Sequence, residues 1–75
     1  MPSLIKTLDD EYKGVRAHAG RTLALIGEPA REAVPRLTEA LEDESQHVRE
    51  VAAEALRRID TVEAREALER NGWPK

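Results

Sequence analysis

The chain has 75 residues, a formal net charge of −3 and no cysteine. The lack of cysteine excludes disulfides, thiolate metal sites and thiol nucleophiles, and the acidic balance argues against general binding of nucleic acid. The longest strongly apolar run, Leu23–Ile26, is too short to cross a membrane, and Met1–Ser3 shows no basic-then-apolar signal sequence. We therefore expect a cytoplasmic protein, and its abundant Ala, Leu, Glu and Arg favour helix.

The N-terminal third of the chain predicts two helices. Leu4, Ile5 and Leu8 form the apolar side of a short first helix, and an acidic turn follows at 9–11. A second helix then runs to Gly27, which is expected to end it with a positive φ. The predicted buried positions of this second helix have helical spacing and are Val15, Ala19, Thr22, Leu23 and Ile26.

The next helix is expected to start near Pro29, because a missing N–H costs nothing in a first turn. Pro35 lies inside the same pattern and predicts a bend or a split. The turn at 42–45 follows, with Ser45 or Asp43 able to cap the next helix. The apolar positions of this segment are Ala30, Ala33, Val34, Leu37, Ala40 and Leu41.

Two further helices are predicted, from about Gln46 to Ile59 and from about Val62 to Arg70. Asp60 and Thr61 can both cap the second of these, and Asp60 with Glu63 has the spacing of a capping box. After Asn71-Gly72, we expect Trp73 to fold back onto Leu68. The helix 46–59 is expected to bury Val48, Ala52, Ala55, Leu56 and Ile59.

The sequence repeats itself after 33 residues. This shift aligns ten identical residues across a 25-residue overlap, most of them apolar and helically spaced. A third, partial copy follows after one extra residue, because Ala30–Ala33 recurs as Ala64–Ala67. The identical pairs are Pro2/Pro35, Leu4/Leu37, Leu8/Leu41, Asp10/Asp43, Glu11/Glu44, Val15/Val48, Arg16/Arg49, Ala19/Ala52, Leu23/Leu56 and Ile26/Ile59.

The segment from Ala33 to Ile59 resembles a HEAT repeat, and more narrowly the short type first associated with phycobilin lyases. The resemblance rests on Ala33-Val34-Pro35-x-Leu37-x-x-Ala40-Leu41-x-Asp43 followed by Val48-Arg49-x-x-Ala52-Ala53-x-Ala55-Leu56-x-x-Ile59. The first copy departs from this pattern at His18, Gly20 and Thr22, which stand where the second copy has Val51, Ala53 and Ala55. The second copy departs from it at Asp60, where the family commonly has glycine.

The resemblance implies an all-α fold, a short right-handed α-solenoid of about five helices, with the second helix of each repeat on the concave side. We expect one domain over 1–75, with unit one at about 2–27, unit two at about 28–60 and a half unit or cap at about 61–75. The resemblance also implies hydrogen bonds between neighbouring units from Asp10, Arg16, Asp43 and Arg49. The predicted core is Val15, Ala19, Leu23, Ile26, Leu37, Leu41, Val48, Ala52, Leu56 and Ile59.

We expect a non-catalytic protein-binding or scaffold module that presents the second helices of its units to a partner protein or peptide. Small residues at helical spacing in the helix that ends at Gly27 would let a partner backbone approach, and charged residues would form the rim. An ordinary solvated face is the plainer interpretation. The candidate contact residues are Lys13, Ala17, Gly20, Arg21, Ala24, Glu50, Glu54 and Arg57.

Three alternatives stay open at this point. The chain could be a structural unit that forms a dimer or stack through its exposed ends, or a fragment of a larger HEAT protein; it could equally be a monomer whose ends are covered by Tyr12, Trp73 and long charged side chains. A metal-dependent enzyme would need His18 and His47, but no His-x-x-x-His spacing or His-Glu pair occurs. We expect no cofactor, no metal and no membrane contact.

We do not expect a nucleic-acid partner, because the predicted concave face mixes both signs of charge. Arg21 and Arg57 would stand beside Glu50 and Glu54. Counterion release needs clustered cations without opposing carboxylates.

Overall fold

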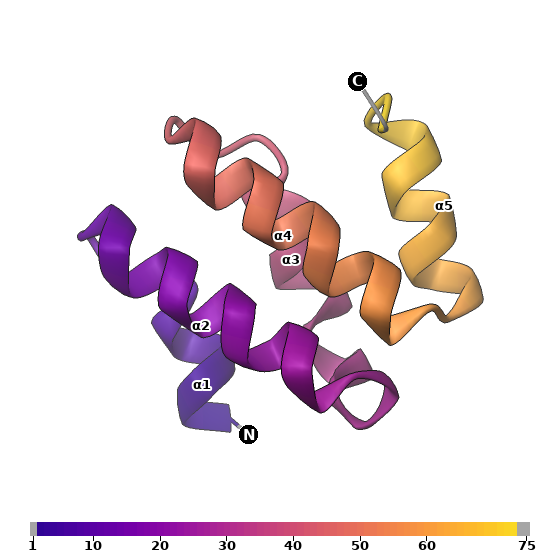
Figure 1. Cartoon of the computed structure of the whole chain (residues 1–75), viewed down its shortest axis with the longest axis horizontal. Helices are drawn as coiled ribbons and strands as arrows, with labels where there is room; N and C mark the ends of the chain where they lie inside the picture. The colour runs from indigo at the N-terminus through magenta and orange to yellow at the C-terminus, as the bar shows by residue number, and fades with distance from the viewer. Residues whose placement is uncertain (1, 74–75) are drawn as a thin grey trace.

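The computed structural model describes the backbone of residues 2–73 and the side chains of residues 5–73. These residues form helices joined by short turns (Figure 1). The elements are α1 (Pro2–Thr7), α2 (Lys13–Ile26), the 3₁₀ helix η1 (Glu28–Ala33), α3 (Val34–Ala40), α4 (Gln46–Ile59) and α5 (Val62–Arg70). The bounds expected for the last two helices are confirmed.

The helices lie in two layers. In Figure 1, α2 and α4 run side by side at the front, and α1 and α3 lie behind them. The α2–α4 contact is the most extensive in the molecule, while α5 packs against α3 and α4 at the C-terminal side. This arrangement is the all-α solenoid expected from the repeat, because each pair of helices packs on the next pair.

The core between the layers is aliphatic. Its largest fully buried side chains are Leu23, Leu37, Leu41, Leu56, Ile59 and Val48. Eight of the ten predicted core positions are buried, namely Ala19, Leu23, Leu37, Leu41, Val48, Ala52, Leu56 and Ile59. Leu8 and Ile5 also contribute as expected, while Leu4 lies outside the described side chains.

Two predicted core residues are exposed instead. Val15 is 38% exposed and Ile26 is 36% exposed, whereas Val48 and Ile59, one repeat later, are 2% and 1% exposed. The difference arises because α4 has a complete helix pair before it, while α2 lies at the edge of the assembly and has only the short α1 behind it (Figure 1). Thr22, also expected in the core, is only half-buried.

Pro35 splits the third helical segment, as predicted. Residues up to Ala33 form the 3₁₀ helix η1, with Ala30 at φ −88° and ψ 15°, and α3 begins at Val34 with Pro35 in its first turn. Proline is tolerated there because the first-turn N–H groups have no partner in the helix. All six predicted apolar positions of this segment are buried.

The helix ends mostly follow the predicted chemistry. The Ser45 hydroxyl accepts a hydrogen bond from the Val48 N–H, and Thr61 accepts one from the Ala64 N–H. The predicted capping box at Asp60 is wrong: Asp60 ends α4 in the left-handed region at φ 52°, so Thr61 caps α5 in its place. Gly27 has the expected positive φ of 77°.

The stop after α5 is a Schellman motif. The Trp73 N–H donates to the Leu68 carbonyl at 2.9 Å, the Gly72 N–H donates to the Glu69 carbonyl at 3.1 Å, and Gly72 has φ 78°. Leu68 and Trp73 both pack against the core. The motif therefore folds the described end of the chain back onto the helix, as the sequence predicts.

Candidate functional site

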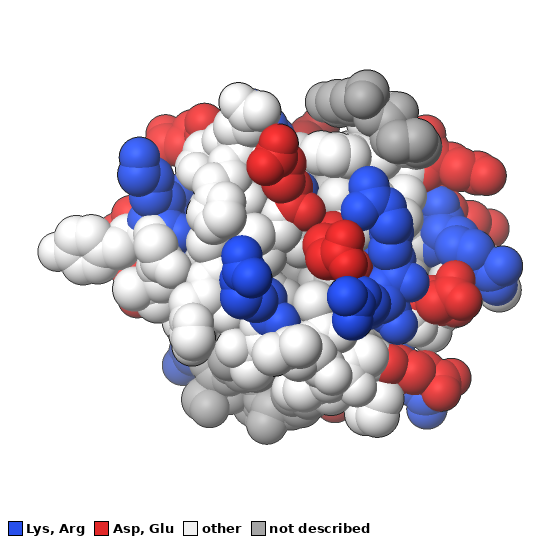
Figure 2. Space-filling model, viewed as in Figure 1, with Lys and Arg blue, Asp and Glu red and all other residues white. Residues whose placement is uncertain are grey.

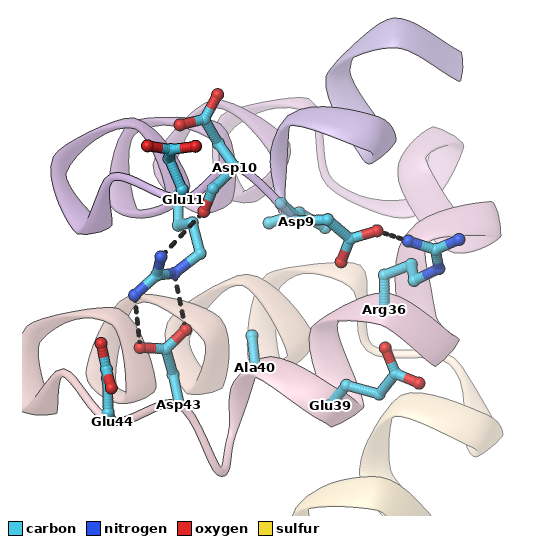
Figure 3. A pocket seen from close by; sticks show the side chains of 10 residues that line it. Asp9, Asp10, Glu11, Arg36, Glu39, Ala40, Asp43 and Glu44 are labelled. Carbon is cyan, nitrogen blue, oxygen red and sulfur yellow. Dashed lines mark hydrogen bonds and ion pairs between the residues drawn. The ribbon is translucent and has the colours of Figure 1, made fainter.

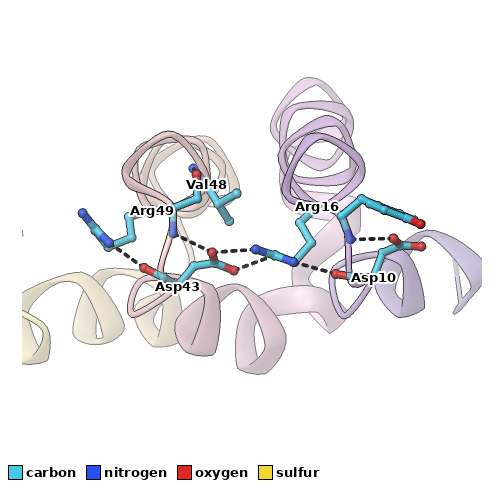
Figure 4. A network of polar contacts seen from close by, with 7 residues as sticks. Asp10, Arg16, Asp43, Val48 and Arg49 are labelled. Atoms are coloured by element: carbon cyan, nitrogen blue, oxygen red, sulfur yellow. Dashed lines mark hydrogen bonds and ion pairs between the residues drawn. The ribbon is translucent and has the colours of Figure 1, made fainter.

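A guanidinium group links the two helix pairs. Arg16 of α2 donates from Nε to Asp43 Oδ2 at 2.7 Å and from Nη2 to Asp43 Oδ1 at 2.9 Å. Its Nη1 donates to the Asp10 carbonyl at 2.8 Å (Figure 4). A two-pronged contact of this kind fixes direction as well as distance. Arg16 therefore sets the register between α2 and the turn that precedes α4.

The same hydrogen bonds recur one repeat apart. The Asp43 carboxylate accepts from the Ser45 N–H at 2.9 Å, just as Asp10 accepts from the Tyr12 N–H at 2.9 Å. Arg49 Nη1 donates to the Asp43 carbonyl at 2.6 Å, as Arg16 does to Asp10. Of the four residues expected to link neighbouring units, Arg16 and Asp43 do so by their side chains. The Asp10 carboxylate and the Arg49 guanidinium group instead make these hydrogen bonds within their own helix pair.

Arg16 and Asp43 shift each other's pKa. Burial raises the pKa of Asp43, but the hydrogen bonds from Arg16 and from the Ser45 N–H outweigh burial and hold that pKa below its usual value. The hydrogen bond to Asp43 raises the pKa of Arg16, although burial opposes this. Both groups are therefore charged at neutral pH, and the contact is an ion pair.

Three predicted contact residues lie elsewhere than expected. Ala17, Gly20 and Ala24 are buried, as is Ala53 of α4. A methyl group added at Gly20 would come within 2.8 Å of Val51 Cγ1. These small residues therefore let α4 approach α2 closely. The helix that packs against them is α4 of the same chain, and not a partner as the sequence predicted.

The remaining predicted contact residues stay on the surface. Lys13, Arg21, Glu50 and Arg57 are exposed and Glu54 is half-exposed. Three of them, Arg21, Glu50 and Glu54, border a groove between α2 and α4 with a volume of about 210 Å³, whereas Lys13 and Arg57 lie outside its lining. We call this region the α2/α4 surface; its groove is lined by Arg21, Ala24, His47, Glu50, Val51 and Glu54.

His47 and Val51 were missed as groove residues. Their spacing to Glu50 and Glu54 places all four on one side of α4, so the helical period contains the signal. Val51 is buried against α2, and the groove floor is therefore apolar. The sequence alone gives no reason to treat a buried valine and an exposed histidine as neighbours of Arg21.

Charges of both signs lie over α4 on this surface (Figure 2). Glu54 accepts from Arg57 at 3.2 Å and from Arg58 at 2.9 Å, and Glu50 accepts from Gln46 at 3.2 Å. Within residues 2–73, Arg21 makes no ion pair. Arg21 is therefore the cation of the groove that is available to a partner.

A second, more open hollow of about 370 Å³ lies between the two acidic turns (Figure 3). Six carboxylates and the guanidinium groups of Arg16 and Arg36 line it. Asp9 is paired with Arg36, and Asp43 is paired with Arg16. In the described part of the chain, no three His, Asp or Glu side chains converge as a metal site.

A family model for HEAT repeats matches residues 1–72, almost the whole chain. The chain belongs to the HEAT repeat family. HEAT repeats commonly mediate contacts between proteins. The match is to HEAT repeats in general, so the resemblance to the phycobilin-lyase type stays a prediction.

Comparison of this HEAT chain with curated proteins and with solved structures gives no match. Among its described helices, none is long and apolar enough to span a bilayer.

Proposed function

We propose that this HEAT repeat chain is a non-catalytic protein-interaction module that binds a partner segment across the α2/α4 surface. The observation that carries the proposal is the groove between α2 and α4, whose floor is Ala24 and Val51 and whose rim is charged. A short apolar floor with a polar rim is the usual anatomy of a surface that holds a helix or peptide.

The charges on the rim indicate what the partner carries. The guanidinium group of Arg21 has no ion-pair partner among the described residues. It would therefore bind a carboxylate of the partner. Glu50 and Glu54 lie across the groove from Arg21 and would bind a basic side chain of the partner. The partner segment is therefore expected to present one small apolar residue flanked by an acidic and a basic residue.

Affinity capture with the full chain as bait tests this surface. A partner isolated from the source cells should be held by the wild type and lost with Arg21→Glu/Arg57→Glu. The first change adds a carboxylate to the groove rim, and the second places one beside Glu54, which Arg57 now pairs with. The matched control is Arg31→Glu/Arg65→Glu, which reverses two exposed arginines of η1 and α5. Binding that survives the first double variant, or that both double variants abolish equally, would contradict the proposal.

The expectation of a self-assembling unit is favoured by a different observation, namely the exposed apolar side of α2 at the edge of the fold. This second candidate function needs a surface other than the groove.

A further inference from the structure

The side of α2 that faces away from α4 carries no charged residue. The helical period of about 100° per residue places six uncharged residues on one arc of about 120°. Leu25 is 77% exposed, and Val15 and Ile26 are exposed as described above. A band of uncharged atoms along α2 is visible in Figure 2. We call this arc the outer strip; its members are Gly14, Val15, His18, Thr22, Leu25 and Ile26.

The repeat shows that this side of the helix is built to be covered. The positions on α4 that correspond to Val15, His18, Thr22 and Ile26 are Val48, Val51, Ala55 and Ile59, and all four are buried. Val51 meets Gly20 of α2, so the preceding helix is part of what covers them. Within residues 2–73, α2 has no such neighbour and packs chiefly on α1, η1 and α4.

The outer strip is complementary to itself. Its six positions are symmetric about residue 20, so an antiparallel second copy would place Gly14 opposite Ile26, Val15 opposite Leu25 and His18 opposite Thr22. A side chain added at Gly14 would meet nothing within 4 Å, which leaves room for the bulk of Ile26. Two antiparallel helices also bring opposite ends of their dipoles together, and no charge would be buried.

We propose that the outer strip is the interface of a symmetric homodimer, in which two copies pack their α2 helices antiparallel about a two-fold axis that passes between His18 and Thr22. Such an interface uses the same patch on both copies. A single helix pair covers less than about 1,200 Å², so the dimer is expected to be weak and to depend on concentration.

Head-to-tail stacking of copies is disfavoured by two side chains on α4. Glu50 and Arg57 occupy the positions that correspond to Ala17 and Ala24, the small residues through which α2 receives α4. A second copy that packed on α4 in the same way would have to bury both charges, at a substantial desolvation cost. The self-matching strip therefore points to a closed pair and not to an open stack.

Sedimentation velocity over a concentration series from about 10 μM to 1 mM tests the dimer. The wild type should pass from monomer to dimer, and Thr22→Glu should stay monomeric because the interface would then bury two carboxylates. Val62→Glu is the control, since Val62 is 59% exposed on α5 and lies outside the strip. A wild type that stays monomeric at the highest concentration, or a dimer that persists in Thr22→Glu, overturns the proposal.

Disulfide trapping tests the antiparallel register, and the cysteine-free chain gives a clean background. Mixed His18→Cys and Thr22→Cys proteins should cross-link to each other faster than either links to itself, because facing helix positions come within disulfide range. Val62→Cys should cross-link only slowly. Equal rates for all combinations would contradict the register, and a fast Val62→Cys link would place the contact elsewhere.

Discussion

Arg16 and Asp43 form the one ion pair of the described chain that is largely withdrawn from water. Their side chains are 11% and 12% exposed, whereas every other ion pair among residues 2–73 joins side chains that are at least 45% exposed. Exposed pairs contribute little because water and salt screen them. The stacking of the two helix pairs therefore depends on this contact more than on the other ion pairs.

Arg16→Lys should lower the free energy of unfolding by about 1–3 kcal/mol, because an ammonium group cannot donate to both Asp43 oxygens and to the Asp10 carbonyl. Arg49→Lys is the matched control: Arg49 makes the corresponding bond to a carbonyl but has no carboxylate partner within residues 2–73. Its cost should stay under about 1 kcal/mol. Urea unfolding at pH 7 measures both, and equal losses would show that the two-pronged contact adds no stability.

Acid should weaken the protein through Asp43. Its pKa is lower in the folded protein than in the unfolded chain, so its ion pair stabilises the fold above the unfolded pKa of about 3.9 and loses this effect as the pH falls through the folded value. The difference in unfolding free energy between wild type and Asp43→Asn should therefore shrink from pH 7 to below about pH 4. A difference that does not change with pH would contradict this role.

The four residues that form the hydrogen bonds around the two turns could be predicted from the sequence, but their bonding partners could not. The repeat marks Asp10, Arg16, Asp43 and Arg49 as equivalent pairs, and the family resemblance implies contacts between units. Only the packing of α2 on α4 decides that Arg16 reaches the next turn. Asp10 has the same local turn bond as Asp43 without that partner, because no arginine precedes it in the described structure.

At the level of elements, α2 and α4 are copies of one helix in different surroundings. Both have 14 residues, and the bounds of α4 and α5 could be predicted because strong apolar periodicity coincides with Ser45 and Thr61 as caps. The exposed side of α2 could not be predicted. Small residues occur both on solvated helix faces and at close contacts between helices. Only the position of a neighbouring helix shows which of the two a given face is.

Gly20→Ala tests the close approach of the two helices. The added methyl group would come within 2.8 Å of the stiff Val51 side chain, and overpacking of this kind costs about 1–3 kcal/mol. Gly14→Ala, in the first turn of the same helix, meets nothing within 4 Å and should instead stabilise, by less than about 1 kcal/mol. Thermal unfolding of dilute protein compares them; if both variants gained stability, the helices would not be in contact at Gly20.

At the scale of the whole molecule, the two sides of the assembly differ. Val15 and Ile26 were expected in the core because the repeat treats every unit alike, but a repeat cannot say which unit has a neighbour. The C-terminal side is packed by α5, whereas α2 leaves its uncharged strip open. The groove and the outer strip use different residues of α2, so the two proposed interfaces have no residue in common.

Nuclear Overhauser contacts between the Gly20 α-protons and the Val51 methyl groups test the stacking of the helix pairs most directly. Because Val51 Cγ1 lies 2.8 Å from the position that a Gly20 Cβ would occupy, strong cross-peaks should connect the two residues. They should persist in dilute samples, since both residues belong to one chain. Gly20 α-protons that contact only water, with Val51 methyl groups directed to other residues, would contradict the fold on which both proposed surfaces depend.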